Sequence, residues 1–143
     1  MHFFGINFFN GNHTPAHLLA LNPVNSTFAI GVGGTLDNTG NTLMTQPGIL
    51  QWQIGGGTIS GGTISGSGFG SVYGSSTLNG VVLETDAFAN ASTLNLSNVP
   101  AFTGRTLTLR NKGAIVFSGT TPLADGNTIT FASGSANLVA TRL

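Results

Sequence analysis

Two histidines spaced four residues apart are the side chains whose arrangement comes nearest to a metal site. His13 and His17 have the spacing of a two-histidine metal face on a helix. No carboxylate lies between residues 1 and 36 to act as a third ligand, and His2 is distant along the chain. We therefore interpret both as capping or interface histidines, and we predict neither a metal nor a cofactor.

The four carboxylates do not suggest a catalytic pair. Glu84 and Asp86 are two residues apart on one predicted strand, so their side chains share a face. A glycosidase pair instead flanks its substrate from two separate elements. Asp37 and Asp125 are accounted for by a predicted loop and turn. We interpret Glu84 and Asp86 as part of a solvated strand face, with calcium binding or an interface role as the open alternative.

No glycine-rich or serine-containing motif indicates an enzyme. Residues 31–36 (GVGGTL) resemble the start of a dinucleotide-binding loop, but the third glycine is replaced by Leu36 and no helix is predicted to follow. The Gly-x-Ser-x-Gly nucleophile elbow is absent. Because no acid, base and nucleophile set is recognisable, we predict that the chain is not an enzyme.

Charged side chains are scarce, which excludes several classes of partner. The 143 residues include four Lys or Arg and four Asp or Glu, for a net charge of zero. Nucleic-acid binding requires clustered basic side chains, so we predict no nucleic-acid partner. No apolar run is long enough for a membrane-spanning helix, so we predict no membrane partner. The hydrophobic fraction of 40% excludes charge-driven disorder.

The elements that must position these residues fall into three zones, of which the first, residues 1–47, holds an apolar arm, a short helix and a first strand. Thr14 is a typical N-cap and Pro15 suits the first helical position, so a helix is predicted over residues 14–21. The arm carries four phenylalanines, which we expect to anchor it in an interface with other subunits; the alternative is a first strand of the domain core. These residues are Phe3, Phe4, Phe8 and Phe9.

The middle zone, residues 48–80, is predicted to be a thin β segment rich in glycine, serine and threonine. The five-residue unit GGTIS occurs twice in succession, and a turn at Gly61-Gly62 would pair Ile59 with Ile64 in a hairpin. Such short strands are not stable alone, so we expect neighbouring chains to bury both isoleucines. The alternative is a flexible glycine-rich linker.

The third zone, residues 81–143, is predicted to be an antiparallel β domain. Residues 92–97 and 105–110 alternate between leucines and polar side chains, as expected of half-buried strands. A loop at 111–113 is predicted to close a hairpin, with Gly113 supplying positive φ and Leu109 facing Ile115. We therefore expect an all-β fold, namely an antiparallel β-sandwich or jelly-roll-like domain with an N-terminal arm and short helix.

An apolar arm, a thin Gly/Ser/Thr-rich β segment and a compact β domain with few charges resemble the small accessory structural proteins of tailed bacteriophage virions. The resemblance implies a capsid decoration (cement) protein that binds the major capsid protein or other virion subunits. It also implies a homotrimer, and location in the virion after assembly in the host cytoplasm. The alternative is a tail-fibre or head-fibre tip that binds a host receptor or glycan. For that role Trp52 and Tyr73 are the candidate aromatic platform.

Overall fold

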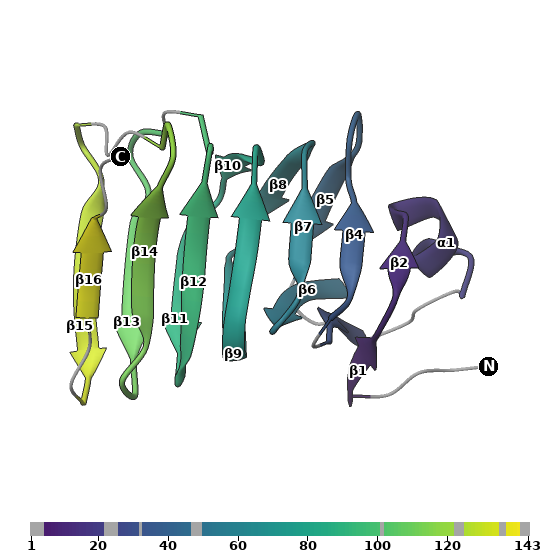
Figure 1. Cartoon of the computed structure of the whole chain (residues 1–143), viewed down its shortest axis with the longest axis horizontal. Coiled ribbons are helices and arrows are strands. Elements are labelled where there is room, and N and C mark those ends of the chain that lie inside the picture. Colours follow the sequence, from purple (N-terminus) through teal and green to yellow (C-terminus); the bar gives the residue numbers. More distant parts are fainter. Residues whose placement is uncertain are drawn as a thin grey trace.

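Short strands make up most of the described chain, and they form three sheets on different sides of one stack (Figure 1). The computed structural model describes residues 5–21, 26–31, 33–46, 50–100, 102–121, 125–134 and 137–140, with the backbone alone at 5–8, 26–30, 133 and 137–140. Sheet A contains β1 (Gly5–Phe9), β3 (Ser26–Ile30), β6 (Leu50–Gly55), the first part of β9 (Phe69–Asn79), β11 (Ala87–Asn90), β13 (Thr106–Arg110) and β15 (Thr128–Ser133). Sheet B contains β2 (Asn12–His13), β4 (Thr35–Asp37), β7 (Thr58–Ser60), the second part of β9, β12 (Ser92–Ser97), β14 (Ala114–Ser118) and β16 (Asn137–Ala140). Sheet C contains β5 (Thr42–Thr45), β8 (Thr63–Gly66) and β10 (Val82–Glu84), and helix α1 (Pro15–Leu19) follows β2.

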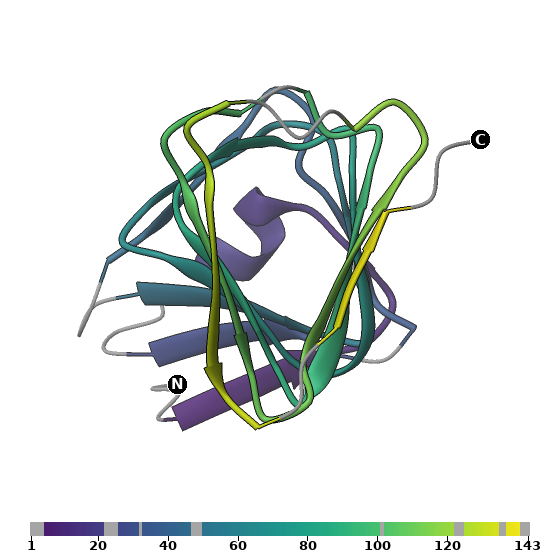
Figure 2. The ribbon, with the colours of Figure 1, turned by 90° about the vertical axis from the view of Figure 1, so that its left-hand side faces the viewer.

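All pairs between these strands are parallel, and the chain visits the sheets in a repeating order as it winds around one interior (Figure 2). β6, β7 and β8 form one coil, for example, and β9 and β10 form the next. The fold is therefore a β-solenoid, and the antiparallel sandwich or jelly-roll expected from the sequence is wrong. One antiparallel contact occurs in the described chain, an isolated bridge between Gln46 and Leu50. The stack includes strands from all three sequence zones.

The coils differ in length, which hides the repeat in the sequence. Gln53 pairs with Gly70, 17 residues later (53 to 70), whereas Ser26 pairs with Leu50, 24 residues later (26 to 50). Parallel neighbours need a long connection, and here that connection is the remainder of a coil. Alternation along one strand is the same in a sandwich and in a solenoid, so the strands were predictable while their partners were not.

The core consists of ladders in which one inward-facing side chain stacks on its equivalent in the next coil. The central ladder of sheet B is uniformly apolar and its members are at most 5% exposed. It comprises Leu36, Ile59, Leu78, Leu96 and Phe117. In sheet C, Ile64 stacks between Leu43 and Leu83. Burial of these ladders supplies the main driving force for folding, at roughly 25 cal/mol per Å² of apolar surface.

The repeated GGTIS unit forms a corner between two sheets, and the predicted Ile59–Ile64 hairpin is wrong. β7 belongs to sheet B and β8 to sheet C, and the two glycines between them have φ values of +68° and +66°. A Cβ at Gly62 would also lie 2.6 Å from the Asn41 carbonyl oxygen. Both glycines are therefore required by the corner itself, because L-residues with side chains rarely adopt this backbone.

The loop at residues 111–113 is likewise a corner, from β13 to β14, and the predicted hairpin there is wrong. Leu109 pairs with Phe131 in sheet A, while Ile115 lies in sheet B. Positive φ occurs at Asn111 (47°) and Lys112 (65°), and not at Gly113. Gly113 is instead needed for space, because a Cβ there would collide with the Ala89 carbonyl oxygen of the preceding coil.

Asparagine side chains connect successive coils at the corners. Asn111 donates from Nδ2 to Asn90 Oδ1 at 2.8 Å, and Asn98 donates to Asn79 Oδ1 at 3.2 Å. Asn38 is fully buried and donates to the carbonyl oxygens of Gly61 (3.3 Å) and Thr63 (3.2 Å). The first two bonds link side chains of successive coils, and the Asn38 bonds occupy backbone carbonyl oxygens at the next corner.

Asn38→Ala is expected to lower the free energy of unfolding by about 2 kcal/mol, because it leaves two carbonyl oxygens without this donor in a buried corner. Urea unfolding followed by circular dichroism would measure the change. Asn41→Ala is the matched control, since exposed Asn41 makes one local side-chain bond, to the Thr39 carbonyl oxygen. Equal losses in the two variants would contradict the assigned role of Asn38.

Helix α1 covers the N-terminal end of the stack (Figures 1 and 2). Its start is as predicted: Thr14 accepts the backbone N–H of His17 through Oγ1 at 3.3 Å. Leu18 is fully buried and belongs to the core cluster, so the helix closes this end of the interior. In the last described coil, by contrast, Phe131 stacks on Leu109 yet is 56% exposed.

Candidate ligand-binding groove

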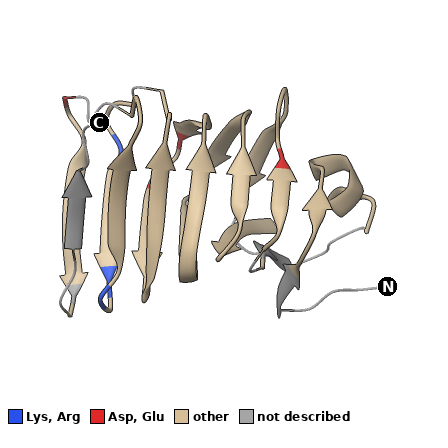
Figure 3. Cartoon of the chain, viewed as in Figure 1, with Lys and Arg blue, Asp and Glu red and all other residues tan. Residues whose placement is uncertain are grey.

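The described charged residues lie at strand ends, corners and turns, which leaves the outer sheet faces largely uncharged (Figure 3). Arg110 ends β13, Lys112 lies in the next corner, and Asp37 and Glu84 end their strands. Between these ends, the outward positions carry mainly Thr, Ser, Asn and Gln. Such a surface offers many hydrogen-bonding groups without strong attraction for either sign of charge.

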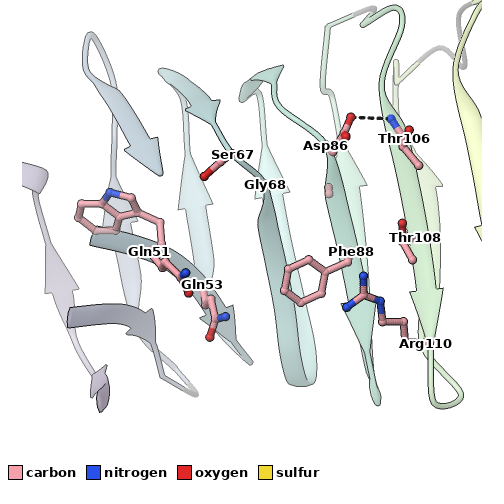
Figure 4. Close-up of a pocket in the computed structure, with 11 residues that line it drawn as sticks. Gln51, Gln53, Ser67, Gly68, Asp86, Phe88, Thr106, Thr108 and Arg110 are labelled. Carbon is pink, nitrogen blue, oxygen red and sulfur yellow. Dashed lines mark hydrogen bonds between the residues drawn. The ribbon is translucent and has the colours of Figure 1, made fainter. Parts of the chain in front are cut away.

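A groove of about 400 Å³ lies on sheet A, where β6, β9, β11 and β13 run side by side (Figure 4). Its volume is within the range of ligand pockets, and it is open to solvent along one side. The side chains relevant to binding are Gln51, Gln53, Asp86, Phe88, Thr108 and Arg110. Figure 4 shows the two glutamines on one side of the Phe88 ring, with Thr108 and Arg110 on the other.

Phe88 lies at the middle of the groove, and a glycine in the neighbouring strand makes room for its ring. Phe88 pairs with Gly70, and its ring occupies the space that a Cβ at Gly70 would fill. The guanidinium carbon of Arg110 lies 5.4 Å from the ring centroid, in the range of a cation–π contact. The ring is thus held in place from two sides and is half-buried, which leaves part of it open to solvent.

The polar groups of the groove are positioned by the strands that carry them. Asp86 Oδ1 accepts the backbone N–H of Thr106 at 2.8 Å, which fixes the carboxylate at the entrance to β11 and β13. Gln51 is exposed, and Gln53 Oε1 is a buried atom without a hydrogen-bond partner among the described residues. A buried acceptor of this kind is commonly satisfied by an ordered water. The groove can therefore both donate and accept hydrogen bonds around an apolar ring.

The structure places the predicted interface residues in different settings. Phe3 and Phe4 lie outside the described residues, and for Phe8 only the backbone in β1 is described. Phe9 is half-buried and packs against the core cluster, with its ring 5.9 Å from that of His13. The interface role of the four phenylalanines remains a prediction.

Ile59 and Ile64 are both 0% exposed within the single chain. Their own neighbouring coils bury them, so no second chain is needed for this purpose. The physical reason is that each coil supplies the missing partner strand that a three-residue strand requires for stability.

The two aromatic residues predicted to contact glycan do not form a platform. Trp52 is among the residues that line the groove, but it is 2% exposed and is one of the largest side chains in the core, so its ring offers almost no surface on which a ligand could stack. Tyr73 is 36% exposed, but its ring lies against Gly55, where an added Cβ would be 2.5 Å from Tyr73 Cε1. Tyr73 is also not among the residues that line the groove.

Glu84 and Asp86 do not share one strand, contrary to expectation. Glu84 ends β10 in sheet C, buried Thr85 follows, and Asp86 precedes β11 of sheet A.

Nearer the N-terminal end of the stack, Thr39 lowers the pKa of Asp37 through a side-chain hydrogen bond and a backbone N–H bond of 3.0 Å. Among the described residues, no group of three or more His, Cys, Asp or Glu could hold a metal ion. None of the described helices is both long and apolar enough to cross a membrane.

Sequence reasoning missed Phe88, Gln51 and Gln53. Phe88 stands between Ala87 and Ala89, and both alanines are buried. Small residues facing inward with a large ring facing outward reverse the usual pattern of a half-buried strand, and this reversal was the available signal. Comparison with known proteins adds no assignment: no family model, curated protein or solved structure matches the chain.

Proposed function

We propose that the chain is a non-catalytic binding module whose sheet A groove takes a glycan. The observation that carries the proposal is the half-buried Phe88 ring, which lies over Gly70 and is bordered by amide, carboxylate and guanidinium groups. This assigns the chain the second of the two roles implied by its resemblance to virion proteins, the receptor- or glycan-binding part of a fibre. The contact residues differ from the Trp52 and Tyr73 expected from the sequence.

Sugar rings match this groove in both of their chemical aspects. The C–H face of a pyranose is apolar and packs on an aromatic ring, while its hydroxyls each donate and accept hydrogen bonds. Exposed Gln51 and Asp86 supply acceptors, and Arg110 supplies donors. One acidic and one basic side chain at the groove favour a neutral glycan over a strongly charged one.

Phe88→Ala is expected to weaken glycan binding at least about tenfold, a loss of about 1.4 kcal/mol, because it removes the ring on which the sugar packs. Glycan arrays would identify a ligand for the intact chain, and titration calorimetry would compare variants. Tyr73→Ala is the matched control, since it removes a ring that also lies on a glycine of sheet A but outside the groove.

Unchanged binding in Phe88→Ala, or an equal loss in Tyr73→Ala, would count against the groove as the binding site. Absence of binding between the intact chain and any neutral glycan on the array would contradict the proposal itself. Thermal melts of both variants would establish that each remains folded during the titration.

Capsid decoration is the second candidate, and the exposure of apolar Phe131 at the end of the stack supports it. An exposed ring on a core ladder suits contact with another subunit. Sedimentation analysis of the purified chain tests the decoration role. A homotrimer in which Phe131→Ser releases monomers supports assembly through this end, whereas a monomer indifferent to the substitution counts against it.

A further inference from the structure

His13 and His17 meet at the N-terminal end of the stack, in a hollow outside the sheet A groove. His13 ends β2 and pairs with Leu36 of the next coil, while His17 lies on the capping helix α1. The two Nδ1 atoms are 3.4 Å apart, and the ring centroids are 5.2 Å apart. The hollow has a volume of about 470 Å³, and Asn12, Thr14, Thr35 and Asp37 complete its lining.

A backbone carbonyl fixes which ring nitrogen of His13 faces its neighbour. His13 Nε2 is 2.8 Å from the Asn10 carbonyl oxygen. A carbonyl oxygen can only accept, so Nε2 carries the proton and Nδ1 of the neutral ring keeps its lone pair. That lone pair is directed at His17 Nδ1. Histidines that ligate metals are commonly anchored in this way, with the second ring nitrogen donating to a carbonyl.

The distance between the two Nδ1 atoms equals the distance between two ligand atoms of a tetrahedral metal site. Two imidazole ligands at 2.0–2.1 Å from a tetrahedral ion are about 3.4 Å apart. A direct N–H···N hydrogen bond of 3.4 Å would instead be long. The pair is therefore better spaced to share a metal ion than to share a proton.

We propose that His13 and His17 bind one divalent transition-metal ion of the Zn²⁺ or Cu²⁺ class through their Nδ1 atoms. Imidazole nitrogen suits these ions, and the remaining coordination positions face the hollow, where water or an exogenous ligand completes them. The ion joins β2 of the first coil to the helix that closes the interior. No third protein ligand is evident from the sequence, but two histidines at this spacing, one of them anchored to the Asn10 carbonyl, form a site of modest affinity.

The test uses the full chain without an affinity tag, titrated with Zn²⁺ by calorimetry and with Cu²⁺ by electron paramagnetic resonance. We expect one ion per chain, hyperfine coupling to two nitrogens, and a melting temperature that rises with metal concentration. His17→Ala is expected to lower the affinity at least about tenfold and to leave coupling to one nitrogen. His17 is exposed, so its metal-free melting temperature is expected to stay unchanged.

His2→Ala is the matched control, because it removes the third histidine of the chain and is expected to leave binding unchanged. Absence of saturable binding at millimolar metal would overturn the proposal. It would equally be overturned if His17→Ala kept the full affinity, or if His2→Ala abolished binding. His13→Ala provides a second ligand variant, read by the nitrogen coupling of the bound Cu²⁺.

Discussion

Replacing Gly113 by alanine is expected to lower the free energy of unfolding by about 3 kcal/mol or more, because the added methyl collides with backbone atoms rather than with a flexible side chain. The Cβ would collide with the Ala89 carbonyl oxygen, and it would also lie 2.7 Å from Ala89 C and 2.9 Å from the Arg110 carbonyl oxygen. β11 would have to separate from the corner that follows β13. Urea unfolding would measure the loss.

Two further variants separate close approach from backbone conformation. Gly40→Ala introduces a methyl where φ is +72° and no atom lies within 4 Å, so it is expected to cost about 1–2 kcal/mol through the left-handed conformation alone. Gly113→Asn would be well tolerated in a hairpin loop that needs positive φ, since asparagine adopts that region readily. In the solenoid corner it is expected to be at least as damaging as alanine. A mild effect of Gly113→Asn would contradict the parallel arrangement.

Trp52→Ala is expected to cost about 3–5 kcal/mol, the range for removing a buried large aromatic side chain. Trp52 is 2% exposed, and its strand β6 is paired with β3 on one side and with β9 on the other. Chemical denaturation of the variant would measure the loss. Met44→Ala, at a 51% exposed position, is the control and is expected to stay within about 0.5 kcal/mol of the parent.

The same variant distinguishes a core residue from a ligand platform. If Trp52 contacted glycan, Trp52→Ala would lose binding while keeping its stability. We expect the opposite order of effects: a large loss of stability, with binding per folded molecule retained at temperatures where the variant is folded. A stable variant with no affinity for glycan would contradict the buried position of Trp52.

Individual strands were predictable from the sequence because side-chain alternation is a local property. Residues 92–97 form β12 as predicted, and Thr14 caps a helix at the expected place. Which strands pair with one another was not predictable in the same way. Leu96, for example, pairs with Leu78 and Phe117, and the two pairs are separated by different numbers of residues because the coils differ in length. Corner glycines also resemble hairpin glycines in sequence, although Gly113 is selected for the space it leaves to Ala89.

The candidate groove was predictable in kind but not in position. A search for exposed aromatic residues is reasonable for a glycan-binding protein, yet residue type favoured Trp52 and Tyr73 over Phe88. Which side of a strand faces outward depends on the coil on either side, and Phe88 is outward because Ala87 and Ala89 occupy the interior. The two histidines of the cap were recognised, while the Asn10 carbonyl that orients His13 depends on the bend between β1 and β2.

The main contacts between strands in the described chain run within a coil or to the adjacent coil. In such a solenoid no strand pairs with a strand several coils away. Its free energy of unfolding is therefore approximately the sum of a contribution from each coil and one from each interface between adjacent coils. Duplication or deletion of one whole coil between β6 and β13 would therefore leave the capping helix and the far end each in an unchanged environment. Genetic change can alter the length of such a protein in steps of one coil, and the distance between its two ends is free to vary while its cross-section is conserved.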